Sequence, residues 1–215
     1  MSSLKIINNE KCSQALWAQE NKQLLNSRGM KMFNVMGIPG SGKTSFIEQT
    51  ILQLKERISI GVITGQMAGV QDAERFSILG VPVCLIELEQ GGLLPAHQIH
   101  EALQYLCSQQ KLDLIFVENI GNLCCPPDYD IGAFTQVVIV DVTAGQDIAD
   151  KYPGIFKQAQ VVVLSKTGLL PYTKTELSLM RSSISRINSS AHICELDSLQ
   201  LSGFEEWIDI LCKIV

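Results

Sequence analysis

Residues 37–44 read Gly37-Ile38-Pro39-Gly40-Ser41-Gly42-Lys43-Thr44 and match the pattern G-x-x-x-x-G-K-[S/T]. An apolar run over residues 31–36 precedes this stretch, and a helical pattern begins near Lys43. Glycines let the backbone turn tightly, so that successive N–H groups point inward at a phosphate, and the following helix adds the positive end of its dipole. The stretch therefore predicts a phosphate-binding loop between a strand and a helix, the arrangement of a P-loop NTPase.

The whole loop is expected to contact a nucleotide, through Gly37, Gly40, Ser41, Gly42, Lys43, Thr44 and Ser45. Lys43 would pair with β- and γ-phosphate oxygens and the Thr44 hydroxyl would bind Mg²⁺, so both would act in catalysis. A further magnesium ligand is expected at the end of a neighbouring strand, where Glu118 and Asp141 each follow an apolar run. Either acid could hold a magnesium-bound water or be only a helix cap or loop acid, and spacing does not rank them.

Strand and helix patterns alternate along the chain. Apolar runs cover residues 31–36, 58–64, 82–88, 112–118, 136–141, 161–165 and 191–196. Helical patterns cover residues 8–26, 43–54, 72–79, 95–109, 173–187 and 203–214. Unbroken apolar strands are typical of a parallel sheet that is buried on both faces. We therefore predict one doubly wound α/β domain over residues 1–215 with a mostly parallel sheet, an N-terminal helix (8–27) packed on it, and ligands at the carboxyl ends of the strands.

Composition narrows the class of protein. The chain has 215 residues, of which 46% are hydrophobic and 18% are charged, so it is not of the disordered class. A net charge of −5 with no basic patch argues against nucleic-acid binding. No apolar run reaches about 18 residues and the start lacks a signal-peptide core, so neither a membrane span nor secretion is expected.

Cysteine usage points to a reducing compartment. The seven cysteines are odd in number and several lie in apolar runs, which is typical of buried, reduced thiols in a cytoplasmic protein. Cys124 and Cys125 differ, because they lie in a loop followed by Pro126, where a thiol is accessible.

The stretch Glu118-Asn119-Ile120-Gly121-Asn122-Leu123-Cys124-Cys125-Pro126, together with the phosphate loop, resembles the hydrogenase nickel-incorporation GTPase family (HypB-type). Residues 72–75, 141–147, 151–153 and 169–172 also match, so the resemblance covers nearly the whole chain. It implies a P-loop metallochaperone that binds and hydrolyses GTP with Mg²⁺, forms a homodimer in the triphosphate state and works with hydrogenase maturation proteins. The related urease GTPases fit less well.

The metal-binding residues of the family are only partly present. Members usually bind metal with a Gly-Cys-His segment and with the cysteine of the Asn-Leu-x-Cys-Pro loop. Cys125 matches that loop cysteine, but residues 91–93 are Gly-Gly-Leu. Nickel and zinc need three or four N or S donors, so one cysteine per chain is too few. Cys124 in a symmetric dimer would give four thiolates, and His97 with His100 could instead reach the site. The alternative is that these are ordinary loop cysteines and surface histidines.

The base-reading and switch segments also depart from the family. Members read guanine with Asn-Lys-x-Asp, whereas this chain has Ser165-Lys166-Thr167-Gly168. Lys166 is still expected to stack on a purine, but Gly168 replaces the carboxylate. A hydrogen bond to a charged group is worth roughly 1.5–3 kcal/mol, which predicts about a tenfold to hundredfold loss of guanine preference. Residues 64–66 are Thr-Gly-Gln instead of Glu-Gly-Asp, and Gly69 replaces a threonine, which predicts slower hydrolysis.

Two functions follow from these observations. The first is a HypB-like GTPase and metallochaperone for nickel insertion into hydrogenase. The second is a divergent paralogue that binds nucleotide or a partner protein, hydrolyses little and holds no nickel. A small-molecule kinase is a third reading, but the chain lacks an evident lid with arginines for the γ-phosphate.

Overall fold

The computed structural model describes residues 9–66, 70–88, 93–119, 123 and 129–214. Their strands form one seven-stranded sheet in the order β3-β2-β4-β1-β5-β6-β7, and every neighbouring pair is parallel. The strands are β1 (Lys31–Gly37), β2 (Ile60–Gln66), β3 (Val83–Glu87), β4 (Leu114–Glu118), β5 (Thr135–Asp141), β6 (Val161–Ser165) and β7 (His192–Glu195). Because the strands are parallel, the turns after β1, β4, β5 and β6 meet at one edge of the sheet, where ligands of α/β proteins bind.

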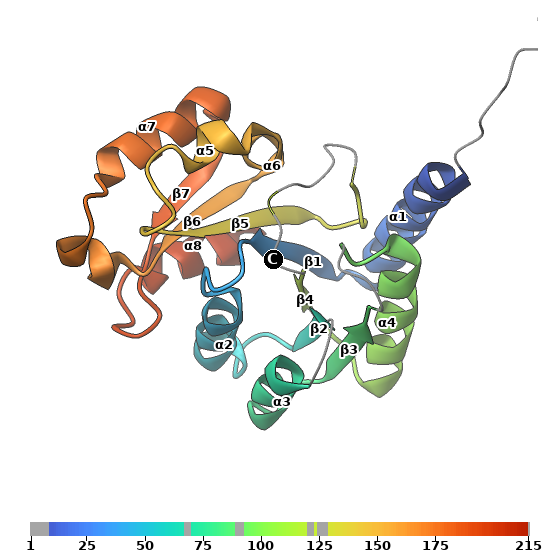
Figure 1. The fold of residues 1–215 in the computed structure, drawn as a ribbon. Coiled ribbons are helices and arrows are strands. Elements are labelled where there is room, and N and C mark those ends of the chain that lie inside the picture. Colours follow the sequence, from blue (N-terminus) through green and yellow to red (C-terminus); the bar gives the residue numbers. More distant parts are fainter. Residues whose placement is uncertain (1–8, 67–69, 89–92, 120–122, 124–128, 215) are drawn as a thin grey trace, which may run out of the picture.

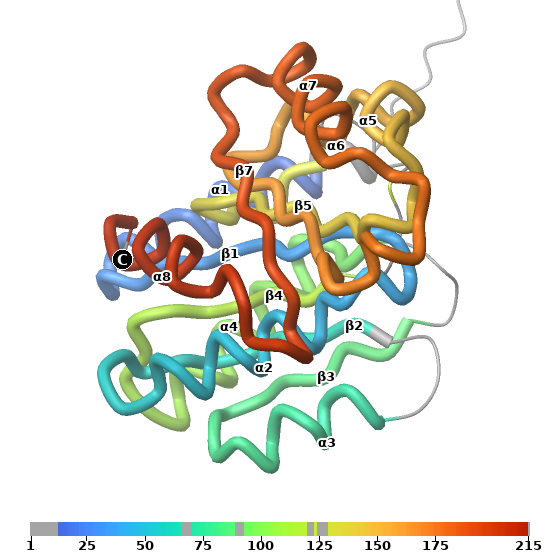
Figure 2. Tube along the Cα trace, turned by 90° about the vertical axis from the view of Figure 1, so that its left-hand side faces the viewer, coloured from blue at the N-terminus to red at the C-terminus, as the bar shows by residue number. Residues whose placement is uncertain are grey.

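Helices cover both faces of this sheet (Figure 1). They are α1 (Asn9–Arg28), α2 (Lys43–Leu54), α3 (Gln71–Ile78), α4 (Ala96–Gln109), α5 (Ile148–Lys151), α6 (Pro153–Gln158), α7 (Leu177–Ile187) and α8 (Phe204–Ile214), with a 3₁₀ turn η1 over Thr167–Tyr172. Helices α2, α3 and α8 share a core with one face, while α1 and α4, and separately α5 to α7, pack on the other. Figure 2 shows α5, α6 and α7 on the opposite side of the strands from α2 and α3.

The face under α2 and α8 is organised around Trp207. Its side chain is fully buried, and its ring lies 4.8 Å from that of Phe46 and 6.1 Å from that of Phe33. The indole Nε1 donates a hydrogen bond of 2.9 Å to Thr50 Oγ1, so the polar atom of this large side chain is also satisfied. These contacts fix α8 and α2 against the sheet and so hold the start of α2 in place.

The opposite face is closed by α1, which packs on α4. Asn21 of α1 is fully buried and donates to Ala96 O at 2.9 Å and to Ile131 O at 3.0 Å. Gly132 has a φ of 85°, and a Cβ there would lie 2.6 Å from Ala18 O, so only glycine allows this close approach. Helix α1 is therefore joined both to α4 and to the segment before β5.

The predicted fold class is confirmed, with differences in the connecting segments. Residues 148–158 form α5 and α6, which are separated at Tyr152 and are each too short to show a helical period. The helix expected from residue 173 begins at Leu177, because both Thr173, which follows η1, and Glu176 have an extended backbone. Among the described residues, no helix is both long and apolar enough to cross a membrane.

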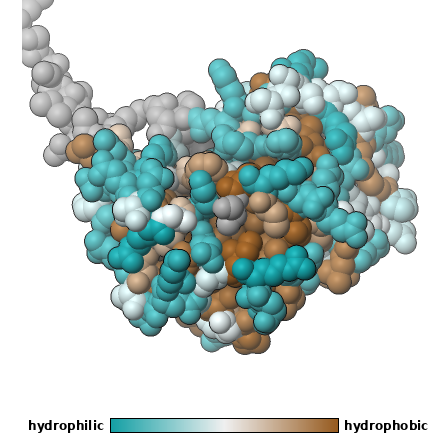
Figure 3. Space-filling model, turned by 180° about the vertical axis from the view of Figure 1, so that it is seen from behind, coloured by the Kyte–Doolittle hydropathy of each residue, from teal (hydrophilic) through white to brown (hydrophobic). Residues whose placement is uncertain are grey.

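The surface seen from behind mixes polar and apolar side chains. Figure 3 shows apolar side chains near the middle of this face, between hydrophilic ones. Folded proteins commonly expose apolar atoms over half or more of their surface, so this mixture alone does not indicate a binding site.

Candidate nucleotide-binding site

The phosphate loop links the end of β1 to α2. Gly42 precedes α2 with a φ of 94° and has no side chain to cap the helix, so the amides of the first turn are left for a ligand. Lys43 bends back over the loop, and its Nζ donates to Gly37 O at 3.2 Å and to Ile38 O at 3.1 Å. Burial lowers the pKa of Lys43, although Glu118 and Asp72 act in the opposite direction. The loop thus holds a buried cation and a set of uncapped amides together.

Thr44 and Glu118 meet beside this loop. The Thr44 hydroxyl donates to Glu118 Oε1 at 2.6 Å, and Thr64 of β2 lies 3.4 Å from Glu118 Oε2. The strand register produces this meeting, because β4 lies between β1 and β2 and sets Glu118 beside Val35 and Thr64. Glu118 is only 5% exposed, and burial raises its pKa to about 7 despite the hydrogen bond from Thr44.

This pair of oxygen ligands fits Mg²⁺. Hydroxyl and carboxylate oxygens are the donors that magnesium prefers, and the ion keeps its remaining positions for water and phosphate. A buried carboxylate with a raised pKa lacks a full opposite charge, and a divalent cation would supply one. The geometry therefore favours Glu118 over Asp141 as the acid nearest Thr44.

Asp141 is engaged differently. Its Oδ1 accepts hydrogen bonds from Thr143, one from the backbone N–H at 2.8 Å and one from the hydroxyl. Its Oδ2 lies 3.7 Å from Lys166 Nζ. Asp141 thus stabilises the turn that follows β5 and forms an ion pair with Lys166.

The end of β6 supports the phosphate loop. Ser165 Oγ donates to Ser41 O at 2.6 Å and Lys166 Nζ donates to Gly40 O at 2.5 Å. Among the described residues, the buried Ser41 Oγ has no hydrogen-bond partner. The end of β6 thus places the predicted nucleotide contact Lys166 beside the phosphate loop.

A pocket of about 280 Å³ continues from the loop toward the turn after β7. It is lined by Gly42, Ser45, Ser165, Lys166, Gly168, Leu169, Asp197, Ser198, Leu199 and Gln200. Residues 197–200 are not among the nucleotide contacts predicted from the sequence. The available signal was an acid directly after an apolar run, as at Glu118 and Asp141.

The predicted transition-metal ligands Cys124 and Cys125 lie outside the described residues. His100 is held in the contact between α1 and α4, with Nδ1 2.9 Å from Asn21 Oδ1 and Nε2 3.0 Å from Gln104 Nε2. Both ring nitrogens of His100 thus have hydrogen-bond partners within the fold, so His100 would have to leave them to reach a metal together with His97. Within the described part of the chain, no three His, Cys, Asp or Glu side chains form a metal-binding group.

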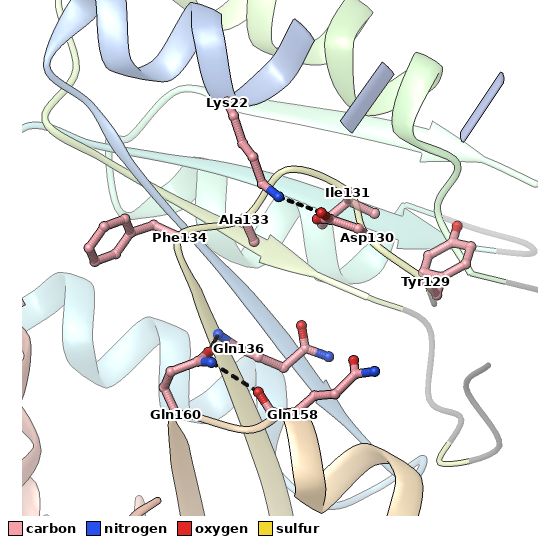
Figure 4. Close-up of a pocket in the computed structure, with 9 residues that line it drawn as sticks. All are labelled: Lys22, Tyr129, Asp130, Ile131, Ala133, Phe134, Gln136, Gln158 and Gln160. Atoms are coloured by element: carbon pink, nitrogen blue, oxygen red, sulfur yellow. Dashed lines mark hydrogen bonds and ion pairs between the residues drawn. The ribbon is translucent and has the colours of Figure 1, made fainter. Parts of the chain in front are cut away.

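A second hollow, of about 390 Å³, lies near the start of β5 (Figure 4). Lys22 and Asp130 form an ion pair of 2.5 Å on one side of it. On the other side, Gln160 Oε1 accepts from Gln136 N at 2.6 Å and Gln160 Nε2 donates to Gln158 O at 3.0 Å. These groups pair largely with one another, so their charges and hydrogen-bonding atoms do not indicate a binding or catalytic site in this hollow.

The sheet order and the loop define a nucleotide-binding domain of the P-loop class. The model of the family described as CobW/HypB/UreG, nucleotide-binding domain, matches residues 31–195. The chain belongs to this family.

Relatives cover nearly all of the chain. It is 35% identical over 198 residues to the probable hydrogenase maturation factor HypB of Methanocaldococcus jannaschii, covering 92% of this chain and 89% of that protein. The crystal structure of HypB from Archaeoglobus fulgidus superposes with a TM-score of 0.88 and 35% identity, over 94% of this chain and 98% of that one. The crystal structure of HypB from Helicobacter pylori in complex with nickel superposes with a TM-score of 0.88 and 28% identity, over 94% of each chain.

Proposed function

We propose that this chain is a HypB-like P-loop GTPase and metallochaperone accessory protein that serves nickel insertion during hydrogenase maturation. Membership of the CobW/HypB/UreG family and similarity to proteins named HypB support this proposal. The observation that carries it is the 2.6 Å contact between Thr44 and Glu118, next to a loop whose amides and Lys43 surround the place for phosphates.

The proposed ligand is GTP with Mg²⁺. Thr44 and Glu118 would hold the ion, Lys43 would move from the loop carbonyls to phosphate oxygens, and the loop amides from Gly37 to Ser45 would bind the phosphates. Bound Mg²⁺ would neutralise the charge that develops on the transferring phosphoryl group. Lys166 would lie against the base, since its Nζ already reaches Gly40 O.

Single-turnover hydrolysis tests this assignment. We expect the wild type to hydrolyse GTP with Mg²⁺, and Thr44→Ala to lose this turnover because the ion loses a ligand. Thr175→Ala, which removes a hydroxyl that donates to Val142 O instead, is the matched control and should retain it. Absence of Mg²⁺-dependent turnover in the wild type would contradict the assignment.

A nickel or zinc site belongs to the same proposal. Two chains of a nucleotide-dependent homodimer would each contribute Cys124 and Cys125 and thus four thiolates. Metal titration of the reduced protein, with and without GTP, should give one ion per dimer, and Cys125→Ala should abolish binding. Unchanged binding in Cys125→Ala would overturn the cysteine site.

The second candidate function is a divergent paralogue that binds nucleotide but hydrolyses little. The replacement of acidic residues supports it, since Thr64, and not an acid, lies near Glu118. Nucleotide binding without single-turnover hydrolysis would favour this candidate over the first.

We also infer a cytoplasmic location and protein partners of hydrogenase maturation. The described cysteines Cys84, Cys107, Cys194 and Cys212 are all free thiols, which suits a reducing compartment. Nucleic acid is not proposed as a partner, because the net charge is −5.

A further inference from the structure

The pocket beside the phosphate loop contains a carboxylate that the proposed function has not used. Asp197 follows β7, is 5% exposed, and lines this pocket together with Gly168 and Lys166. The backbone N–H of Gly168 donates to Asp197 Oδ2 at 3.0 Å. A carboxylate from one turn is thus joined directly to the turn that carries Lys166.

Because Gly168 has no side chain, the side chains of Asp197 and Gln200 occupy the space beside it. A Cβ at position 168 would lie 2.9 Å from Asp197 Oδ2 and 2.6 Å from Gln200 Nε2. A side chain at 168 could therefore not coexist with these two groups in their present positions. The polar end of the pocket is formed by residues 197 and 200 instead.

Asp197 is held as an acceptor. Its Oδ1 accepts the N–H groups of Leu199 at 2.8 Å and Gln200 at 2.9 Å, and its Oδ2 accepts that of Gly168. Burial acts to raise the pKa of Asp197, but these three hydrogen bonds outweigh it and the pKa is lowered. Since a carboxylate oxygen has two lone pairs, Oδ2 retains one for a ligand in the pocket.

The other walls suit a flat ring. Leu199 is 94% exposed and Leu169 is 41% exposed, and both line the pocket, so part of its wall is apolar. Gly42 and Ser45 border it on the loop side. A base joined to phosphates on the loop would reach this pocket and cover the leucines.

Hydrogen-bond chemistry then selects among the purines. The edge of guanine presents two adjacent donors, N1–H and the exocyclic amine, whereas adenine presents an acceptor at N1. An ionised carboxylate only accepts, so it pairs with guanine and opposes adenine. The amide of Gln200 can turn its oxygen toward the second guanine donor.

We propose that Asp197, with Gln200 beside it, selects guanine in this chain in place of a side chain at position 168. This inference rests on the proposed nucleotide site. It reverses the expectation that the loss of a carboxylate at 168 removes guanine preference.

Competition between GTP, ATP and xanthosine triphosphate (XTP) tests the proposal in the whole chain with Mg²⁺. Xanthine carries an oxygen in place of the guanine amine, so Asp197→Asn should pair with XTP through its new amide donor. We expect the wild type to prefer GTP, and Asp197→Asn to lower the GTP to XTP preference by at least about tenfold. Asp209→Asn, which removes the same charge from α8, should leave the preference unchanged.

A purely structural role gives a different result. Asp197→Asn would then weaken the binding of GTP, ATP and XTP by the same factor, because only the shape of the turn would change. That outcome would overturn the proposal. A wild type that binds ATP as tightly as GTP also overturns it, while leaving the nucleotide site intact. If no triphosphate binds the wild type, the proposed function itself fails.

A swap keeps the proposal testable if Asp197→Asn does not fold. Asp197→Ser should lose the guanine preference, and Gly168→Asp with Asp197→Ser should restore it, because the carboxylate returns from the facing turn. The neighbour of the new side chain is the flexible end of Gln200, which can move aside. Nucleotide binding by the double variant without recovered preference would contradict the proposal.

Discussion

Folding and ligand binding have opposite effects on the charge of Glu118. Burial on folding disfavours the charged carboxylate, whereas binding of Mg²⁺ favours it. The carboxyl is buried and its pKa is raised to about 7 from an ordinary value of 4.5, mainly by desolvation. Between these pH values the folded chain binds more protons than the unfolded chain. Without ligand, Glu118 therefore makes the free energy of unfolding fall as pH rises from about 4.5 to 7.

The variant Glu118→Gln should lack this dependence, because an amide does not titrate. Urea unfolding of the nucleotide-free, magnesium-free protein at pH 5 and pH 7.5 measures it. We expect wild type to lose more stability over this interval than Glu118→Gln does. Equal losses in the two proteins would mean that the Glu118 pKa is not raised.

At the level of residues, the sequence makes definite predictions where the chemistry is local and leaves alternatives open where it is not. The loop motif indicated Thr44 and Lys43, since its residues are consecutive. The choice between Glu118 and Asp141 depends on strand order and register, which join Glu118 to Val35 and Thr64. Asp197 lies 29 residues from Gly168 in the sequence, so the local pattern could not reveal their contact.

At the scale of elements, the attachment of α1 depends on Asn21. Its amide satisfies the carbonyls of Ala96 and Ile131 in a buried place. Asn21→Ala would remove this buried donor from both carbonyls, and we expect a loss of about 2–3 kcal/mol in the free energy of unfolding. Urea denaturation measures this loss.

The matched control lies one residue further along α1. Lys22 pairs with Asp130 at the surface, where both side chains are about half exposed, so Lys22→Ala should cost less than about 1 kcal/mol. Similar losses for Asn21→Ala and Lys22→Ala would show that the buried amide does not anchor the helix.

Elements were predictable in proportion to their apolar pattern. The strands β1, β4, β5 and β6 are largely buried runs that the sequence displays directly, whereas β3 and β7 at the sheet edges are only partly buried. Helices α4 and α8 show clear helical periods. Helices α5 and α6 are too short for a period to emerge, and their Pro153 and Gly154 suggest a loop. Their helical form depends on packing against α7 and the sheet.

At the scale of the whole molecule, the sheet order brings the turns after β1, β4, β5 and β6 to one edge. The sequence indicated parallel strands but not this order, because neighbours such as β1 and β5 are far apart along the chain. A ligand bound at this edge would contact several elements at once and would stabilise the folded chain as a unit.

Ligand-induced stabilisation can be predicted by mass action. With free GTP and Mg²⁺ at about 100 times the dissociation constant, the free energy of unfolding should rise by about 2.7 kcal/mol. Chemical denaturation with and without ligand measures the change. An increase that persists in Lys43→Ala at the same ligand concentration would place the ligand elsewhere.

Calorimetric titration of GTP with Mg²⁺ into wild type and Lys43→Ala tests whether the loop after β1 binds a nucleoside triphosphate. Lys151→Ala, which removes an exposed lysine of α5, is the control. We predict saturable binding to wild type and Lys151→Ala, and binding weakened at least about tenfold in Lys43→Ala, because a buried cation is lost. Equal affinity of all three proteins, or no binding by wild type, would contradict triphosphate binding at this loop.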